Sequence, residues 1–236
     1  MIDPYRMIVV NLIASILLIV SVFIYIKFAR KKINLFALLI LISILPVISI
    51  FRKGVYESGD FTFHVYRAMA FYDSLKDGAI IPSWAGSLNG EYGYPVFVFI
   101  YNIPYYLMSL LHLFGFTFIF SERVILATAY IGSGIAMWFL LKKLTKSDLG
   151  AFTGSILYLF TPYHLVDLHF RVAISETIAF LLAPLIFYLI LKLQEKRKLI
   201  YIVWIGLLLG ILFLTHPPMF IFYTLIFSFF ILYQIF

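Results

Sequence analysis

The chain contains no cysteine among its 236 residues. This absence excludes disulfide scaffolds, thiolate zinc sites, iron–sulfur clusters and catalysis by a cysteine nucleophile. The sequence also lacks a glycine-rich phosphate loop ending in Lys-Ser or Lys-Thr, and it lacks the dinucleotide-binding fingerprint. Chemistry that depends on a thiol or on a bound nucleotide cofactor is therefore not expected.

Charged residues are scarce as well. They make up 12% of the chain, whereas 64% of the residues are hydrophobic; ordinary soluble domains are about a quarter charged. A water-soluble monomer of this length cannot remove so much apolar surface from its boundary with water. The composition therefore predicts an integral membrane protein whose main partner is the lipid bilayer.

The hydrophobic residues form runs that approach the length of about 20 residues needed to cross a bilayer as a helix. Since open strands leave unpaired backbone groups in lipid, we expect an all-α polytopic membrane protein with about seven transmembrane helices. The runs are 7–26, 33–51, 124–141, 149–165, 177–193, 199–215 and 218–236. A further stretch, 95–118, is interrupted by Pro95, Asn102, Pro104 and His112, as is typical of an interfacial or re-entrant segment.

The formal net charge of +7 would suit a nucleic-acid partner, but the positions of the charges favour another explanation. If 95–118 does not cross the membrane, three basic clusters fall on one side, as the positive-inside rule requires of the cytoplasm. The clusters are Lys27/Arg30/Lys31/Lys32, Lys142/Lys143/Lys146 and Lys192/Lys196/Arg197/Lys198. We therefore expect no nucleic-acid partner, and we place 52–122, 164–176 and 215–218 outside the cytoplasm. The large first loop, 52–122, would hold in-plane or re-entrant helices.

The first external loop carries a helix signal. Ser58 or Asp60 can cap a helix that runs to about Lys76 and stops at Asp77-Gly78. The loop that follows is rich in turn residues, which predicts an ordered loop and not a helix.

Four polar residues at the start of this helix share one stripe by their spacing: Glu57, Asp60, His64 and Arg67. A general base for a hydroxyl can be an ionised carboxylate held beside the acceptor, so Asp60 and Glu57 are candidate catalytic residues, and His64 on the same stripe is a third. The alternative is a solvated stripe on an amphipathic interfacial helix.

Aromatic side chains follow in the same loop. Trp84, Tyr92 and Tyr94 are candidates to stack on a sugar ring or a polyprenyl chain. The alternative is the aromatic belt that is found at membrane boundaries in general.

A second polar cluster directly precedes a predicted span. It consists of Asp167, His169, Arg171 and Glu176. Charged side chains at a membrane entrance cost desolvation free energy unless they are paired with opposite charges, and they therefore often mark a functional site. His216, at the outer end of a later span, is a candidate to contact a phosphate, although a lone interfacial histidine is more often structural.

Three acids on this face are candidate metal ligands. Carboxylates are the ligands that hard divalent cations such as Mg²⁺ or Mn²⁺ prefer, and Asp60, Asp167 and Glu176 are the candidates. The spacing is not specific enough to predict a metal site.

The arrangement resembles the C-type glycosyltransferase superfamily (GT-C), polytopic enzymes that use polyprenyl-phosphate-linked sugars. It is most similar to the bacterial and archaeal membrane proteins labelled 6-pyruvoyl-tetrahydropterin synthase-related; the label implies no pterin chemistry here. The resemblance lies in 60–106, with support from Arg171 and Glu176. The residues that carry it are Gly59-Asp60, His64, Arg67, Leu75, Gly78, Pro82, Trp84, Leu88-Asn89-Gly90, Tyr92-Gly93-Tyr94-Pro95 and Pro104-Tyr105-Tyr106.

The resemblance implies an enzyme that moves a sugar from a polyprenyl-phosphate donor to an acceptor on the extracytoplasmic face of a prokaryotic plasma membrane. Asp60 would be the base of an inverting displacement, and Asp167 or Glu176 the acid of the second loop. The paired acidic signature common in the superfamily is absent. The alternatives are a non-catalytic scaffold or polymer-binding subunit of a cell-envelope system and a transporter. We expect 1–236 to be one transmembrane domain, the N-terminal part of a longer protein.

Overall fold

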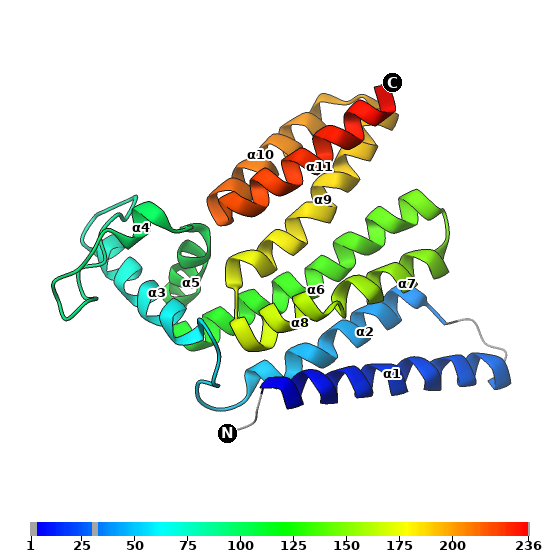
Figure 1. The fold of residues 1–236 in the computed structure, drawn as a ribbon, viewed down its shortest axis with the longest axis horizontal. Helices are drawn as coiled ribbons and strands as arrows, with labels where there is room; N and C mark the ends of the chain where they lie inside the picture. The colour runs from blue at the N-terminus through cyan, green and yellow to red at the C-terminus, as the bar shows by residue number, and fades with distance from the viewer. Residues whose placement is uncertain (1–3, 30–32, 236) are drawn as a thin grey trace.

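The computed structural model describes residues 4–29 and 33–235, and these residues form helices and loops without a β-strand (Figure 1). The predicted all-α fold is thus confirmed for the described chain. Three helices are long and apolar enough to cross a membrane: α1 (Pro4–Ala29), α6 (Phe118–Thr145) and α9 (Ile174–Lys196). These three helices have the length and composition of membrane spans.

The predicted count of about seven spans is not confirmed. Four of the expected spans are shorter helices in the described structure: α2 (Leu35–Ile48), α7 (Asp148–Leu159), α10 (Leu199–Thr215) and α11 (Pro217–Ile235). The run 149–165 is divided because Pro162 disfavours helical backbone in the residue before it and starts a new short helix, α8 (Pro162–Val166). A continuous hydrophobic run therefore does not become a continuous helix here.

The long helices lie side by side, and their connections gather at two opposite ends (Figure 1). The connections around 146–147 and 197–198 share one end, where the ion pair of Lys143 with Glu195 joins α6 to α9. Lys27 closes the last turn of α1 at the same end, while Arg30, Lys31 and Lys32 lie outside the described residues. The segments 52–117 and 160–173 lie at the other end.

The stretch 95–118 forms short helices and turns, which its proline and asparagine residues predicted. It contains α4 (Val96–Phe99) and α5 (Ile103–Leu113), and Pro104 lies in the first turn of α5. An 11-residue helix is about 16 Å long, too short to cross the hydrocarbon layer. α5 packs between α3 (Phe61–Lys76) and the start of α6.

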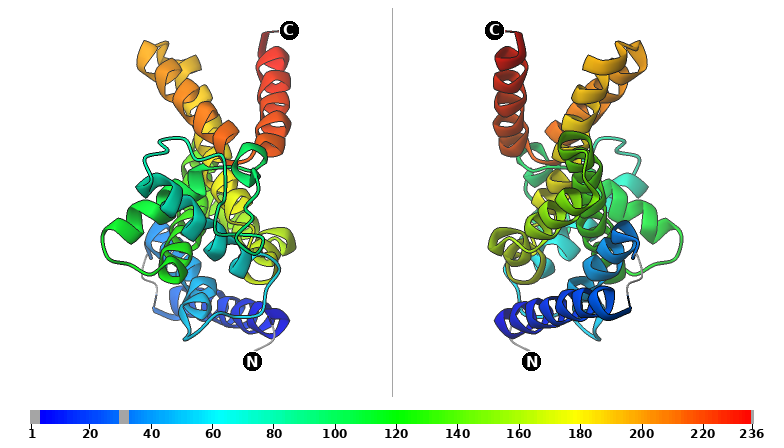
Figure 2. Two further views of the ribbon diagram at one scale, coloured as in Figure 1. Left: turned by 90° about the vertical axis from the view of Figure 1, so that its left-hand side faces the viewer. Right: turned by 90° about the vertical axis from the view of Figure 1, so that its right-hand side faces the viewer.

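α6 and α9 form the centre of the bundle, and α10 lies against α9. Small residues allow α6 to approach its neighbours closely: a Cβ added at Gly134 would lie 2.7 Å from Leu159 of α7, and one at Gly132 would lie 3.1 Å from Leu181 of α9. In the side views of Figure 2, α10 and α11 diverge from the turn that joins them. Their many exposed leucine, isoleucine and phenylalanine side chains suit contact with lipid.

Candidate functional site

The site begins where two distant loops are hydrogen-bonded through their backbones. The N–H of Gly59 donates to the carbonyl of Phe170 at 2.7 Å, and the N–H of Asp60 donates to the carbonyl of Arg171 at 2.8 Å. A Cβ at Gly59 would lie 3.1 Å from the Arg171 carbonyl oxygen, so only glycine fits this approach without a shift. The start of α3 is thereby fixed beside the second polar cluster.

The second cluster owes its shape to a π-helical turn, η2 (Asp167–Arg171), which follows α8. Val172 then adopts a left-handed backbone conformation with φ of 58°, which redirects the chain into α9. Such a conformation is uncommon for a β-branched residue and persists only where its surroundings hold it. The Ala173 N–H donates to the Asp167 carbonyl at 3.0 Å and closes the turn. As a result Glu176, in the first turn of α9, faces Arg171.

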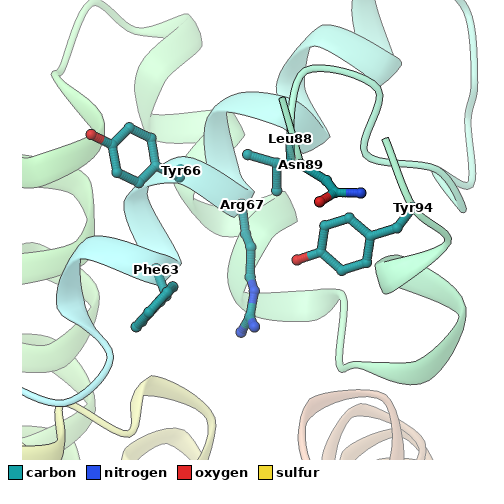
Figure 3. Close-up of a pocket in the computed structure, with 6 residues that line it drawn as sticks. All are labelled: Phe63, Tyr66, Arg67, Leu88, Asn89 and Tyr94. Carbon is teal, nitrogen blue, oxygen red and sulfur yellow. The ribbon is translucent and has the colours of Figure 1, made fainter. Parts of the chain in front are cut away.

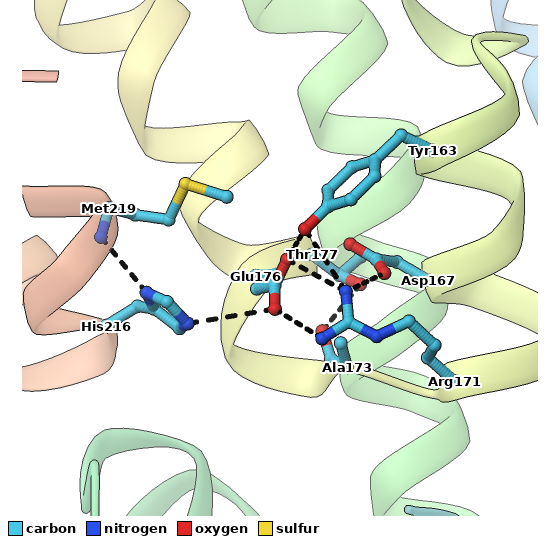
Figure 4. A network of polar contacts seen from close by, with 8 residues as sticks. All are labelled: Tyr163, Asp167, Arg171, Ala173, Glu176, Thr177, His216 and Met219. Carbon is cyan, nitrogen blue, oxygen red and sulfur yellow. Dashed lines mark hydrogen bonds and ion pairs between the residues drawn. The ribbon is translucent and has the colours of Figure 1, made fainter. Parts of the chain in front are cut away.

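Arg171 is the centre of a polar network (Figure 4). Its Nη1 donates to Asp167 Oδ1 at 2.8 Å, and its Nη2 donates to Glu176 Oε1 at 2.8 Å. The hydroxyl of Tyr163 donates to the other Glu176 oxygen and accepts from Arg171 Nη1 at 3.1 Å. The Asp167 side chain is fully buried, whereas that of Arg171 is 40% exposed, so part of the guanidinium is open to an anion from outside.

The network holds two carboxylates and one guanidinium. Burial raises the pKa of Asp167 to about 7, and the charge of Glu176 adds to this effect while Arg171 opposes it. The hydrogen bond with Glu176 and the charge of Asp167 raise the pKa of Arg171, against the effect of its own burial. Near neutral pH the network can therefore take up or release one proton at Asp167.

His216 joins the network from the turn between α10 and α11. Its Nδ1 accepts the Met219 N–H at 3.1 Å, so in the neutral ring the proton lies on Nε2, which is 3.8 Å from Glu176 Oε1 (Figure 4). Burial lowers the pKa of His216, partly offset by the charge of Glu176. The ring of Tyr101 stacks on His216 with 6.0 Å between centroids.

Tyr101 links the two halves of the site. Burial is the main cause that raises the pKa of its hydroxyl; the charges of Asp60 and Glu176 add to it, and that of Arg67 opposes it. All three charged groups therefore lie near this phenol. Asp60 occupies the N-cap position of α3, is partly exposed, and its carboxylate makes no capping hydrogen bond.

Three of the predicted residues lie apart from the network. Glu57 is exposed and precedes α3, so it does not share the helical stripe, because the helix begins only at Phe61. His64 is fully buried, and its Nδ1 lies 3.1 Å from the hydroxyl of Tyr105. His169 is fully buried as well, and its Nε2 lies 3.4 Å from the amide nitrogen of Asn11 on α1.

The two buried histidines are uncharged near neutral pH. Burial lowers the pKa of both His64 and His169 to about 4. The described residues contain no group of three or more histidine or acidic side chains placed to hold a metal ion. The predicted ligand set of Asp60, Asp167 and Glu176 is thus not assembled as a metal site in the described structure.

A pocket of about 500 Å³ lies between α3 and the loop that contains Leu88, Asn89 and Tyr94 (Figure 3). Its lining residues are Phe63, Tyr66, Arg67, Leu88, Asn89 and Tyr94. Two of the predicted aromatic residues, Trp84 and Tyr92, are not among them; their side chains are largely exposed. Of the predicted aromatic contacts, the structure therefore brings Tyr94 to the pocket.

The sequence prediction missed two groups. Tyr163 bridges Glu176 and Arg171, but a lone tyrosine at a membrane boundary gives no signal of its own. Glu122, at the start of α6, is fully buried, and neither of its carboxylate oxygens has a hydrogen-bond partner among the described residues. Its position two residues before the predicted span 124–141 was a signal that could have drawn attention to it.

Comparison with known proteins places the chain in a family. Residues 99–236, more than half of the chain, match the family described as "6-pyruvoyl-tetrahydropterin synthase related domain; membrane protein". The chain belongs to this family. The match includes the network of η2 and α9, whereas Asp60 and Arg67 precede it.

A relative from Lactococcus lactis subsp. cremoris (strain MG1363), named "Uncharacterized protein", is 25% identical to this member of the synthase-related membrane family over 176 residues. The aligned part covers 73% of this chain and 29% of the relative. The chain thus spans less than a third of the length of that relative. No solved structure matches the chain.

Proposed function

We propose that the protein is a membrane glycosyltransferase that moves a sugar from a polyprenyl-phosphate donor to an acceptor hydroxyl outside the cytoplasm. The observation that carries the proposal is the backbone pairing of Gly59 and Asp60 with Phe170 and Arg171. This pairing joins the backbone at Asp60, which is partly exposed, to the segment that carries Arg171, whose side chain is 40% exposed.

Asp60 acts as the general base. It is partly exposed and is not occupied by a capping hydrogen bond, so it can accept the proton of an incoming hydroxyl. The oxygen of that hydroxyl attacks the anomeric carbon of the donor sugar while the bond from this carbon to the phosphate oxygen breaks. This single displacement inverts the anomeric configuration.

The leaving phosphate needs stabilisation of its charge. The exposed part of the Arg171 guanidinium and the Nε2–H of His216 supply it at the η2 side of the site. Arg67 supplies a second cation, about two helical turns beyond Asp60 along α3. In an inverting displacement the acceptor and the leaving group occupy opposite faces of the sugar. Cations on two separate elements, Arg171 on η2 and Arg67 on α3, suit that requirement.

The apolar ends of the neighbouring helices suit a lipid-linked donor. A polyprenyl chain is soluble only in the bilayer, so its phosphate is presented at the boundary where this polar site lies. No nucleotide-binding motif is needed for such a donor.

The test is sugar transfer by the protein in nanodiscs with polyprenyl-phosphate sugars. Asp60→Asn should lower the transfer rate by at least 100-fold, the scale of a lost general base. The matched control is Asp77→Asn, which makes the same change at an exposed position at the end of α3. Unchanged transfer by Asp60→Asn would refute the mechanism; absence of transfer by the unaltered protein with every such donor would favour the scaffold alternative.

A further inference from the structure

Arg67 is a half-buried cation without an acidic partner. Among the described residues no carboxylate lies within ion-pair distance of its guanidinium. Its neighbours are the ring of Phe63, with its centroid 6.0 Å away, and the phenol groups of Tyr94 and Tyr105. Burial opposes the charge, but the phenol oxygens outweigh it and raise the pKa of Arg67. A partly desolvated guanidinium without a counter-ion is prepared to receive an anion.

Two other cations near this end of the molecule have acidic partners. Arg171 is bound by Asp167 and Glu176, and Lys76 lies 3.8 Å from Asp73.

The walls around Arg67 suit a saccharide. Phe63, Tyr66 and Tyr94 supply aromatic surfaces on which the C–H face of a pyranose can pack, and the Asn89 amide can bond to hydroxyl groups (Figure 3). The volume of about 500 Å³ lies within the range of about 300–1,000 Å³ typical of small-molecule sites.

The loop that forms one wall is held in a defined shape. Asn89, Gly90, Glu91 and Gly93 all have positive φ, between 57° and 67°. The N–H of Gly93 donates to the Leu88 carbonyl at 2.9 Å, and a Cβ at Gly93 would lie 2.3 Å from the indole nitrogen of Trp84. A wall fixed in this way loses little conformational entropy when a ligand binds.

We infer that the Arg67 pocket binds an acidic saccharide, with the carboxylate or phosphate of the sugar on the Arg67 guanidinium and the ring against Phe63, Tyr66 and Tyr94. A planar guanidinium binds either anion in a bidentate manner, which a lysine at this position would not do. In the proposed transfer this saccharide is the acceptor. That role rests on the proposed function, whereas the binding does not.

The binding is tested by calorimetric titration of the 236-residue protein in neutral lipid nanodiscs. The ligands are glucuronate oligomers, glucose oligomers of the same length, glucose 1-phosphate and inorganic phosphate. The glucuronate oligomers should bind at least 10-fold more tightly than the glucose oligomers. Arg67→Gln should remove this preference, and Arg67→Lys should restore part of it. Lys76→Gln removes one positive charge from the same helix and should leave the preference unchanged.

Equal affinity for the charged and neutral oligomers, or a preference that survives in Arg67→Gln, overturns the inference. Binding of inorganic phosphate as tight as that of glucose 1-phosphate overturns the role of the aromatic walls. If Arg67→Gln does not fold, Tyr94→Phe takes its place and should weaken glucuronate binding several-fold. Asp60→Asn separates the two proposals, because it should abolish transfer and leave this binding intact.

Discussion

Replacement of Arg171 by methionine tests the polar network most directly. Methionine keeps much of the apolar stem but removes the guanidinium. Two carboxylates, that of the fully buried Asp167 and that of Glu176 with 10% exposure, would then face each other without a cation.

The expected loss of stability follows from these exposures. Removing one partner of a fully buried ion pair costs about 3–5 kcal/mol. Because the Arg171 side chain is 40% exposed, water screens part of the interaction, and we expect a loss of about 2–3 kcal/mol near neutral pH.

The loss should grow with pH. Burial already raises the pKa of Asp167 to about 7, and without the opposing charge of Arg171 it would rise further. An acid with a raised pKa in the folded state binds more protons folded than unfolded, so folding stability falls as pH rises toward that pKa. In the wild type this decline ends near pH 7; in the variant it continues, by up to about 1.4 kcal/mol per pH unit.

The measurement is unfolding by dodecyl sulfate in mixed micelles at pH 5.5 and pH 8.5. Asp167→Asn in the Arg171→Met background should recover part of the lost stability at pH 8.5, because it removes one of the two uncompensated charges. Lys142→Met, which breaks an exposed ion pair with Asp148, should cost less than about 1 kcal/mol at both pH values. A cost of Arg171→Met that is the same at both pH values would refute the reasoning about Asp167.

Two further predictions concern the loop and the topology. Gly93→Ala should destabilise the pocket wall and lower acidic-saccharide affinity at least 10-fold, because the added Cβ would overlap Trp84. Gly90 has a similar positive φ, but a Cβ there would meet open space, so Gly90→Ala should have the smaller effect. Thermal unfolding and calorimetric titration of the two variants test this difference. In the cysteine-free chain, Thr117→Cys should react with an impermeant maleimide from outside the cell and Ser147→Cys should not; labelling of Ser147→Cys from outside would overturn the assignment of sides.

Local sequence signals predicted several elements correctly. The end of α3 at Lys76, before Asp77-Gly78, follows from the left-handed glycine that ends a helix. The interruption of 95–118 follows from proline and asparagine at the helix starts. Both depend on backbone preferences within a few residues, and these can be identified in the sequence.

The site itself depended on contacts between segments more than 100 residues apart. Periodicity placed Glu57 on a helical stripe with Asp60. In the structure the helix begins at Phe61, directly after Asp60, whose backbone N–H is bonded to the Arg171 carbonyl. It could not show that His64 and His169 face the protein interior, since a polar residue beside a predicted span can face either side.

Composition and the lengths of the hydrophobic runs by themselves determined that this chain is an all-helical membrane protein, because the free energy of transferring a segment into lipid depends mainly on its residue types. The positions of the charges likewise placed most acids away from the basic clusters. Only the tertiary structure decided which helices are long enough to span, and which cations have partners. The backbone pairing of Asp60 with Arg171, the approach of His216 to Glu176 and the position of Arg67 in its pocket are properties of packing between distant segments, and no local pattern carries that information.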